Sequence, residues 1–414
     1  MLQPENTDAQ SDFVRLPDDV LILILGQLDL ISQLKMTHVH IRFLMLMPQV
    51  WRLQCKSMTL SLLELDISGK DLRLFLGSNQ DNFQALWLKT ITRINFNILT
   101  GYIFPNVHDF RFSTTSFRLK DSDIPRIIRA FPNLRTFSPY GNFTGQHMQD
   151  FPRLENLTLT YCSKFKVENL HHILETLQLK SLKLEKFGER HFKDTKLPLK
   201  GMQNLEVLEC NTGEMTGCFL EHMKHLNKLK KLLLCGFIHW YVVRMVLDSC
   251  HQKNVKSVEV NASGADIFYL FHELPLQIQT LQVTNAIIPL NEMPNSRVYF
   301  ENIKQIYLRY CVFNLQEDFD KLLTNSNTLE ILGLDGCLFG FQDYTFSVRE
   351  IVKHRDRALH LHLHQNMYLE YKDKVGQRIY KEFFMILTLF SCRNCQCNGT
   401  WRVNIVSSSC TTAL

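Results

Sequence analysis

Aliphatic residues recur along the middle of the chain in one fixed pattern. Each copy has an aliphatic residue, a second one three positions later and a third two positions after that, except for one weaker copy in which Cys210 takes the third position. The copies begin at Leu154, Leu179, Leu205, Leu229, Val255, Ile278, Ile303 and Leu329. Their starts are 25, 26, 24, 26, 23, 25 and 26 residues apart. A period this regular predicts a series of repeated structural units.

The spacing inside each copy predicts a short strand. The aliphatic side chains would point into a shared core, while the residues between them would face the other side of a sheet. Stretches with helical periodicity, such as 123–131 and 316–324, lie between the predicted strands. We therefore expect an α/β repeat solenoid with a parallel sheet over residues 56–365. The repeats should be irregular at 56–133, regular at 134–340, and end on a strand near Leu359.

A helical pattern precedes the repeats. Residues 1–12 are polar, and we expect them to be disordered. Pro17 and the two acidic residues after it are typical of the first turn of a helix, and apolar residues follow at helical spacing from Val20 to Leu28. Ser32 is a candidate cap for a second helix, and a third helix is predicted over 41–47, ending near Pro48. Three short helices over 13–55 have more apolar positions than one small core needs, which indicates a surface for a partner or for the next domain.

The order of residue types in this segment resembles the F-box family. The matching residues are Leu16, Pro17, Asp18, Val20, Ile24, Leu28, Asp29, Leu34, Val39, Phe43 and Trp51. The segment departs from the family pattern at Ser32 and Gln33, where the family usually has Asp-Leu, at His40, and at Phe43, where Trp is usual. The period of the following units is similar to that of leucine-rich repeats, in which each unit has one strand and one helical segment.

An F-box followed by leucine-rich repeats implies a substrate-recognition subunit of an SCF-type ubiquitin ligase. In that family the F-box docks on the Skp adaptor, which joins it to the cullin and RING subunits, and the repeats bind the target protein. The chain would then be no enzyme and would need no cofactor. The implied adaptor-docking residues, or residues of the small core that supports docking, are Leu16, Pro17, Val20, Ile24, Leu28, Leu34, Val39 and Trp51.

Residues between the core aliphatics are candidates for binding a target on the concave face of the predicted sheet. The selected positions are Lys183, Glu209, Glu259, Tyr307, Arg309 and Tyr310. Tyrosine and arginine commonly anchor protein interfaces, and the charges on this face are mixed. The face as a whole is therefore a candidate site for a protein.

Composition narrows the classes of partner. The 46 basic and 41 acidic residues leave a formal charge of +5, which gives no nucleic-acid or membrane-anchoring stretch. The polar start lacks the pattern of a secretory signal, and the longest apolar run, 383–390, is too short to cross a bilayer. We therefore expect a cytoplasmic or nuclear protein with reduced thiols. Cys162, Cys311 and Cys337 follow predicted strands and should be structural.

The remaining chemistry-bearing patterns are weak. Cys392, Cys395 and Cys397 have spacing like that of metal ligands but lack a good second pair, so we expect no metal. The alternating histidines at 360, 362 and 364 are interpreted as polar strand residues. Residues 366–390 are a candidate cap for the repeats, and we expect 391–414 to be an irregular, disordered tail that contains cysteines. A repeat scaffold without ligase recruitment stays open, whereas an enzymatic or small-molecule role has no supporting motif.

Overall fold

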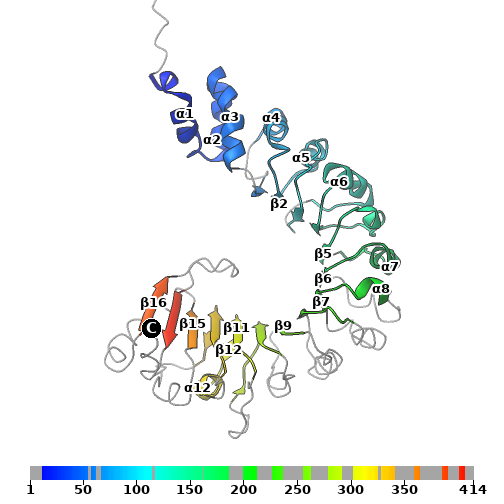
Figure 1. The fold of residues 1–414 in the computed structure, drawn as a ribbon, viewed down its shortest axis with the longest axis vertical. Coiled ribbons are helices and arrows are strands. Elements are labelled where there is room, and N and C mark those ends of the chain that lie inside the picture. Colours follow the sequence, from blue (N-terminus) through cyan, green and yellow to red (C-terminus); the bar gives the residue numbers. More distant parts are fainter. Residues whose placement is uncertain are drawn as a thin grey trace, which may run out of the picture. The chain divides into compact units, whose positions relative to one another are not determined.

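The computed structural model divides the 414-residue chain into two compact units, Met1–Leu179 and Lys180–Leu414. Both units have an α/β fold in which parallel strands follow one another in chain order (Figure 1). The structure describes residues 12–54, 57–61, 67–113, 117–160, 162–185, 199–211, 226–235, 255–262, 278–290, 302–324, 328–340, 359–363, 385–389 and 401–405.

The first unit begins with three helices and continues with strands that alternate with helical segments. Strands β1 to β5 pair in order and run parallel. Helices α4 to α7 lie on one side of these strands (Figure 1). The bounds are α1 Asp18–Leu25, α2 Leu30–Val39, α3 Ile41–Gln54, β1 Ser57–Ser61, α4 Gly69–Asn79, β2 Ala85–Thr90, α5 Arg93–Leu99, β3 Asp109–Phe112, α6 Ile124–Ala130, β4 Thr136–Ser138, β5 Asn156–Thr160 and α7 Val167–Thr176. Short 3₁₀ turns span Asp12–Arg15, Asp121–Asp123 and Met148–Asp150.

The start of α2 differs from the prediction. Asp29, not Ser32, is the cap: its Oδ1 accepts a hydrogen bond of 3.0 Å from the Ser32 backbone N–H. The Ser32 hydroxyl donates to Asp29 Oδ2 at 2.8 Å. The helix therefore begins at Leu30, because the carboxylate satisfies an N–H group of the first turn that has no partner within the helix.

Helix α3 also runs further than expected. It passes through Pro48 and ends at Gln54, although a proline inside a helix removes one backbone hydrogen bond. The turn after Pro48 carries Val50 and Trp51, which are both fully buried. Burial of these two side chains stabilises the helical turn beyond the proline, and local sequence preference alone misses this effect.

The core of the first unit is built largely from aromatic rings in contact. Trp51 packs edge-on against Phe75 of α4 at 5.1 Å between ring centroids, and Phe75 contacts Phe83 at 5.8 Å. The contacts continue through Phe83–Phe104, Phe104–Phe131, Phe131–Phe110, Phe110–Phe137 and Phe137–Phe151. This aromatic chain joins the three N-terminal helices to the strands as far as the segment before β5.

The second unit contains the more regular repeats. Strands β6, β7, β8, β9, β10, β11, β13 and β15 follow one another in the sheet, and their described pairings are parallel. The bounds are β6 Ser181–Glu185, α8 Leu199–Met202, β7 Val207–Asn211, β8 Lys231–Cys235, β9 Ser257–Asn261, β10 Thr280–Thr284, β11 Gln305–Arg309, β12 Val312–Phe313, α12 Gln316–Thr324, β13 Ile331–Asp335, β14 Leu338–Phe339, β15 Leu359–Leu363, β16 Met385–Leu389 and β17 Trp401–Ile405. Strands β12 and β14 form a separate parallel pair.

The predicted strands are confirmed where the structure describes them. In β9, β10 and β11 the core aliphatics are buried and the residues between them are half-buried. Helices α6 and α12 fall within the predicted stretches 123–131 and 316–324. A parallel sheet with this register is compatible with a solenoid of repeats.

The chain after β15 differs from the prediction. Strand β17 pairs antiparallel with β15, and β16 pairs antiparallel with β17. Strand β17 lies inside 391–414, for which an irregular tail was expected. Its sequence alternates Trp401, Val403 and Ile405 with polar residues, which is the pattern of a strand. The predicted domain boundaries themselves stay predictions.

Candidate functional site

The structure separates core from surface among the predicted adaptor-docking residues. Leu34 and Trp51 are buried between the three helices. Pro17, before α1, and Val39, at the end of α2, are exposed. The half-buried residues are Leu16, Val20, Ile24 and Leu28. The set therefore contains both packing residues and residues that a partner can reach.

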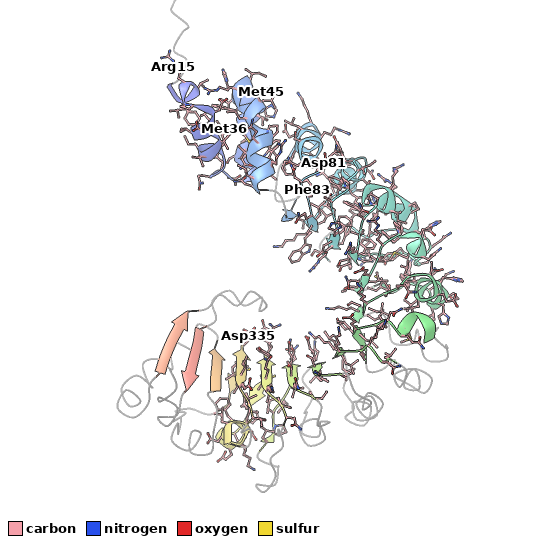
Figure 2. All side chains as sticks on the ribbon, in the orientation of Figure 1. Arg15, Met36, Met45, Asp81, Phe83 and Asp335 are labelled. Atoms are coloured by element: carbon pink, nitrogen blue, oxygen red, sulfur yellow. The ribbon has the colours of Figure 1, made fainter. Side chains whose placement is uncertain are left out.

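Large apolar side chains on the same helices are exposed. Val39 and Ile41, on either side of the α2–α3 junction, are each 66% exposed, and Met45, one helical turn beyond Ile41, is 70% exposed (Figure 2). Ile41 and Met45 occupy neighbouring positions on one face of α3 because they are four residues apart. We call these three residues the apolar junction surface. Leu23 of α1 and Leu53 of α3 are also exposed.

Sequence reasoning selected only Val39 from the apolar junction surface. Periodicity indicates which helix faces are apolar, but it does not show which of them another element of the chain covers. The sequence of α3 carries no local signal that marks Ile41 and Met45 as exposed, because exposure depends on contacts with other elements of the chain.

A buried amide organises the three helices from inside. Gln33 of α2 donates from Nε2 to the Leu25 carbonyl at 3.1 Å, the Leu28 carbonyl at 3.0 Å and Gln54 Oε1 at 2.9 Å. Its Oε1 accepts a 2.9 Å hydrogen bond from Trp51 Nε1. The departure from the family pattern at Gln33 is thus accommodated by a satisfied polar network that ties the end of α1 to α2 and α3.

An ion pair fixes the entry to α1. Arg42 Nε of α3 donates to Asp18 Oδ1 at 2.9 Å, and the Arg42 guanidinium also donates to the Val14 carbonyl. The segment with Leu16 and Pro17 lies between these two contact points in sequence. Arg42 therefore holds the start of α1 beside α3.

In the second unit, the predicted target-binding residues form pairs across neighbouring strands. Lys183 of β6 and Glu209 of β7 are 3.9 Å apart. Lys231 Nζ lies 3.0 Å from the Glu259 carboxylate, which also accepts from Gln282 Nε2 at 3.0 Å. We call this side of the sheet the polar sheet face. Its paired charges give it little net charge, and Glu209 is almost completely buried.

Two tyrosines lie against glycines of the next repeat. A Cβ on Gly333 would lie 2.6 Å from the Tyr307 ring, and a Cβ on Gly336 would lie 2.6 Å from the Tyr310 ring. Both glycines therefore make room for an aromatic ring. Between the tyrosines, Arg309 Nε lies 3.7 Å from the Asp335 carboxylate.

Tyr310 has a left-handed backbone conformation, which is unfavourable for tyrosine. The residue after each of β10, β11 and β13 is left-handed, with φ of 53° at Asn285, 50° at Tyr310 and 62° at Gly336. Asparagine and glycine adopt this conformation readily, whereas for tyrosine it is unfavourable by about 1 kcal/mol. Tyr310 is 61% exposed, although its ring lies against Gly336. An exposed aromatic side chain is therefore held at a strained backbone position.

The glycine partners could have been found from the sequence. Gly333 and Gly336 follow Tyr307 and Tyr310 by one repeat, 26 residues in each case. Residues one repeat apart are neighbours across the sheet, as the register Tyr307–Gly333 shows.

Three cysteines whose side chains the structure describes, Cys162, Cys311 and Cys337, are buried. Burial raises the pKa of Cys162 to about 12. The hydrogen bond between Cys311 and Cys337, together with burial, raises the pKa of Cys337, and the same hydrogen bond lowers the pKa of Cys311. These positions suit structural thiols.

No metal or membrane element stands out in the part of the chain that the structure describes. Among those residues, no group of three or more histidine, cysteine or acidic side chains is placed to hold a metal ion. None of the described helices has the length and apolar character that a membrane span requires. Cys392, Cys395 and Cys397 lie outside the described residues, as do His364 and the side chains of β15.

Comparisons with known proteins leave the chain without an assigned family. No family model matches it, and no curated protein is significantly similar to it.

Proposed function

We propose that this chain is a substrate-recognition subunit of an SCF-type ubiquitin ligase. The observation that carries the proposal is the apolar junction surface, which lies in a helical segment whose residue order resembles the F-box. The parallel repeats that follow, with a period similar to that of leucine-rich repeats, support the same assignment. In this role the helices dock on the Skp adaptor, and the repeats hold a target protein.

In ubiquitin transfer, this chain positions the target protein and carries out no chemical step itself. The adaptor links it to the cullin and RING subunits, and the conjugating enzyme supplies the activated ubiquitin. Holding the target beside that enzyme replaces a rare encounter in solution by one at high effective concentration.

Within the helices, the proposal gives different roles to the predicted residues and to the exposed residues of the apolar junction surface. Val39, Ile41 and Met45 contact the adaptor, because they are apolar and accessible. Leu34 and Trp51 support the surface from within the core. Leu16 and Pro17 belong to the segment that Arg42 holds beside α3, so they dock or position the docking surface.

Binding of the full chain to purified Skp adaptor tests the proposal. We expect Ile41→Asp with Met45→Asp to abolish binding, and Leu16→Ala with Pro17→Ala to weaken it. Ile94→Asp is the matched control, because Ile94 on α5 is equally exposed and apolar but lies outside the three helices.

Circular dichroism of each variant verifies that the chain remains folded. A folded wild-type chain that does not bind the adaptor would overturn the ligase assignment and leave a repeat scaffold. Equal loss of binding in Ile94→Asp would remove the assignment of the apolar junction surface.

A further inference from the structure

In the second unit, lysines recur at the residue that precedes a strand, along the series of strands β6 to β11 and β13. The positions are Lys180, Glu206, Lys230, Lys256, Gln279, Lys304 and Glu330. Along this series, each backbone N–H donates to the carbonyl of the preceding member, at 2.7, 2.8, 3.1, 2.9, 2.8 and 2.7 Å. Neighbouring members are therefore one strand apart, about 4.8 Å. We call these seven positions the lysine row.

The lysine row has an excess of positive charge. Lys230 Nζ lies 2.7 Å from the Glu206 carboxylate, and that hydrogen bond, with the charges of Lys230, Lys180 and Lys228, lowers the pKa of Glu206. Glu206 is therefore paired with Lys230 within the row. The seven positions of the row hold four lysines, two glutamates and one glutamine, which gives a net charge of +2.

The fold does not require lysine at these positions. In the first unit the equivalent residues are Gln84, His108, Arg135 and Glu155, which are joined by the same type of backbone hydrogen bond at 2.9 Å each. When histidine is counted as neutral, the charges of Arg135 and Glu155 cancel, and these four positions have no net charge. The positive charge is therefore a property of the second unit's sequence and not of the position in a repeat.

The exposure of the row leaves the ammonium groups accessible. Lys230, Lys256 and Lys304 are exposed, and within the described part of the chain neither Lys256 nor Lys304 has an ion-pair partner. Lys230 and Lys256 occupy neighbouring positions and repel each other, so an anionic ligand along the row would relieve that repulsion and would be attracted by Lys304.

Charge complementarity selects the ligand. We propose that the lysine row binds an acidic, extended segment of a protein partner. The row spans about 29 Å, which corresponds to eight or nine residues of extended chain at about 3.4 Å each. It has no arginine and no aromatic side chain for stacking, which disfavours nucleic acid. The inference rests on the proposed function in treating the partner as the target held by the repeats.

Fluorescence anisotropy with the full chain tests this inference. The probe is a labelled 12-residue peptide of alternating glutamate and serine, and the same peptide with glutamine is its neutral counterpart. At 50 mM salt we expect binding of the glutamate peptide alone, weakening steeply as salt rises. Lys256→Glu with Lys304→Glu should reduce affinity at least about tenfold. Lys70→Glu with Lys164→Glu, two exposed lysines of the first unit, makes the same charge change and should leave binding unaltered.

Several outcomes would overturn the inference. These are no binding of the glutamate peptide, equal binding of both peptides, or equal loss in both lysine variants. Tighter binding of a labelled single-stranded or double-stranded oligonucleotide than of the peptide would identify a nucleic-acid surface instead. Adaptor binding is measured on the same samples, because a chain that binds the adaptor but not the peptide contradicts only the inference about the lysine row.

Discussion

The buried amide of Gln33 offers a quantitative test of how the helical segment is held together. Gln33→Leu keeps a side chain of similar size and introduces the residue usual in the F-box family. It also removes the acceptor of the Trp51 indole N–H, which is fully buried. A buried donor left without a partner costs about 1–3 kcal/mol. Because the added leucine gains some apolar burial, we expect a net destabilisation of about 2 kcal/mol.

A double-mutant cycle isolates the Gln33–Trp51 hydrogen bond. Trp51→Phe removes the donor, so the combined variant has no unpaired indole N–H. We therefore expect the double variant to be more stable than the sum of the single effects predicts, by about 1–2 kcal/mol. The measurement is hydrogen exchange of peptides from α1 to α3 in the full chain, followed by mass spectrometry, which reports the opening of this segment separately from the repeats.

Two results would refute the reasoning about Gln33. One is additivity of the two substitutions within about 0.5 kcal/mol. The other is a Gln33→Leu chain whose helices exchange as slowly as those of the wild type. In either case the amide network would be incidental, and packing alone would hold the three helices.

Three further substitutions test other parts of the structure. Tyr310→Asn should raise the free energy of unfolding by about 1 kcal/mol by relieving left-handed strain, and an unchanged melting temperature would contradict that strain. Asp123→Ala should lower stability by about 2 kcal/mol, because it leaves Arg93 without the carboxylate that it contacts at 2.6 Å; urea unfolding measures this loss, and a change below about 0.5 kcal/mol would remove the role of the pair. Burial lowers the pKa of His171, so the unfolded chain takes up its proton first and stability should fall as pH drops below 6.5. His171→Gln should flatten that dependence between pH 7.5 and 5.5, and a His171→Gln curve that runs parallel to the wild-type curve would contradict the assignment.

The strands of the repeats were predictable because one constraint fixes them. Residues such as Leu281 and Val283 must be buried on one side of a strand, and a slip of one residue would expose both. That constraint is local and periodic, so it is readable from the sequence.

The features missed in the helical segment depend on distant contacts. The continuation of α3 past Pro48 depends on the burial of Trp51 against Phe75, which is 24 residues away in the chain. The stabilising effect of Gln33 depends on its hydrogen bonds to groups of α1 and α3, which lie close together only in the folded chain. The exposure of Met45 depends on whether other elements of the chain pack over it, and the sequence of its own helix does not contain that information.

The aromatic chain from Trp51 to Phe151 has a practical consequence for dissecting the protein. Each ring fills space against the next, so cutting the polypeptide just after the third helix would leave one side of Trp51 in water in place of Phe75. Such a fragment would lose part of the packing that stabilises α3 beyond Pro48, so a failure of the isolated helices to bind a partner would not show that the full chain fails to bind it. The shortest piece that retains every ring with its neighbours extends beyond Phe151, so a minimal fragment for binding studies should end after β5 and not at the close of the helical segment.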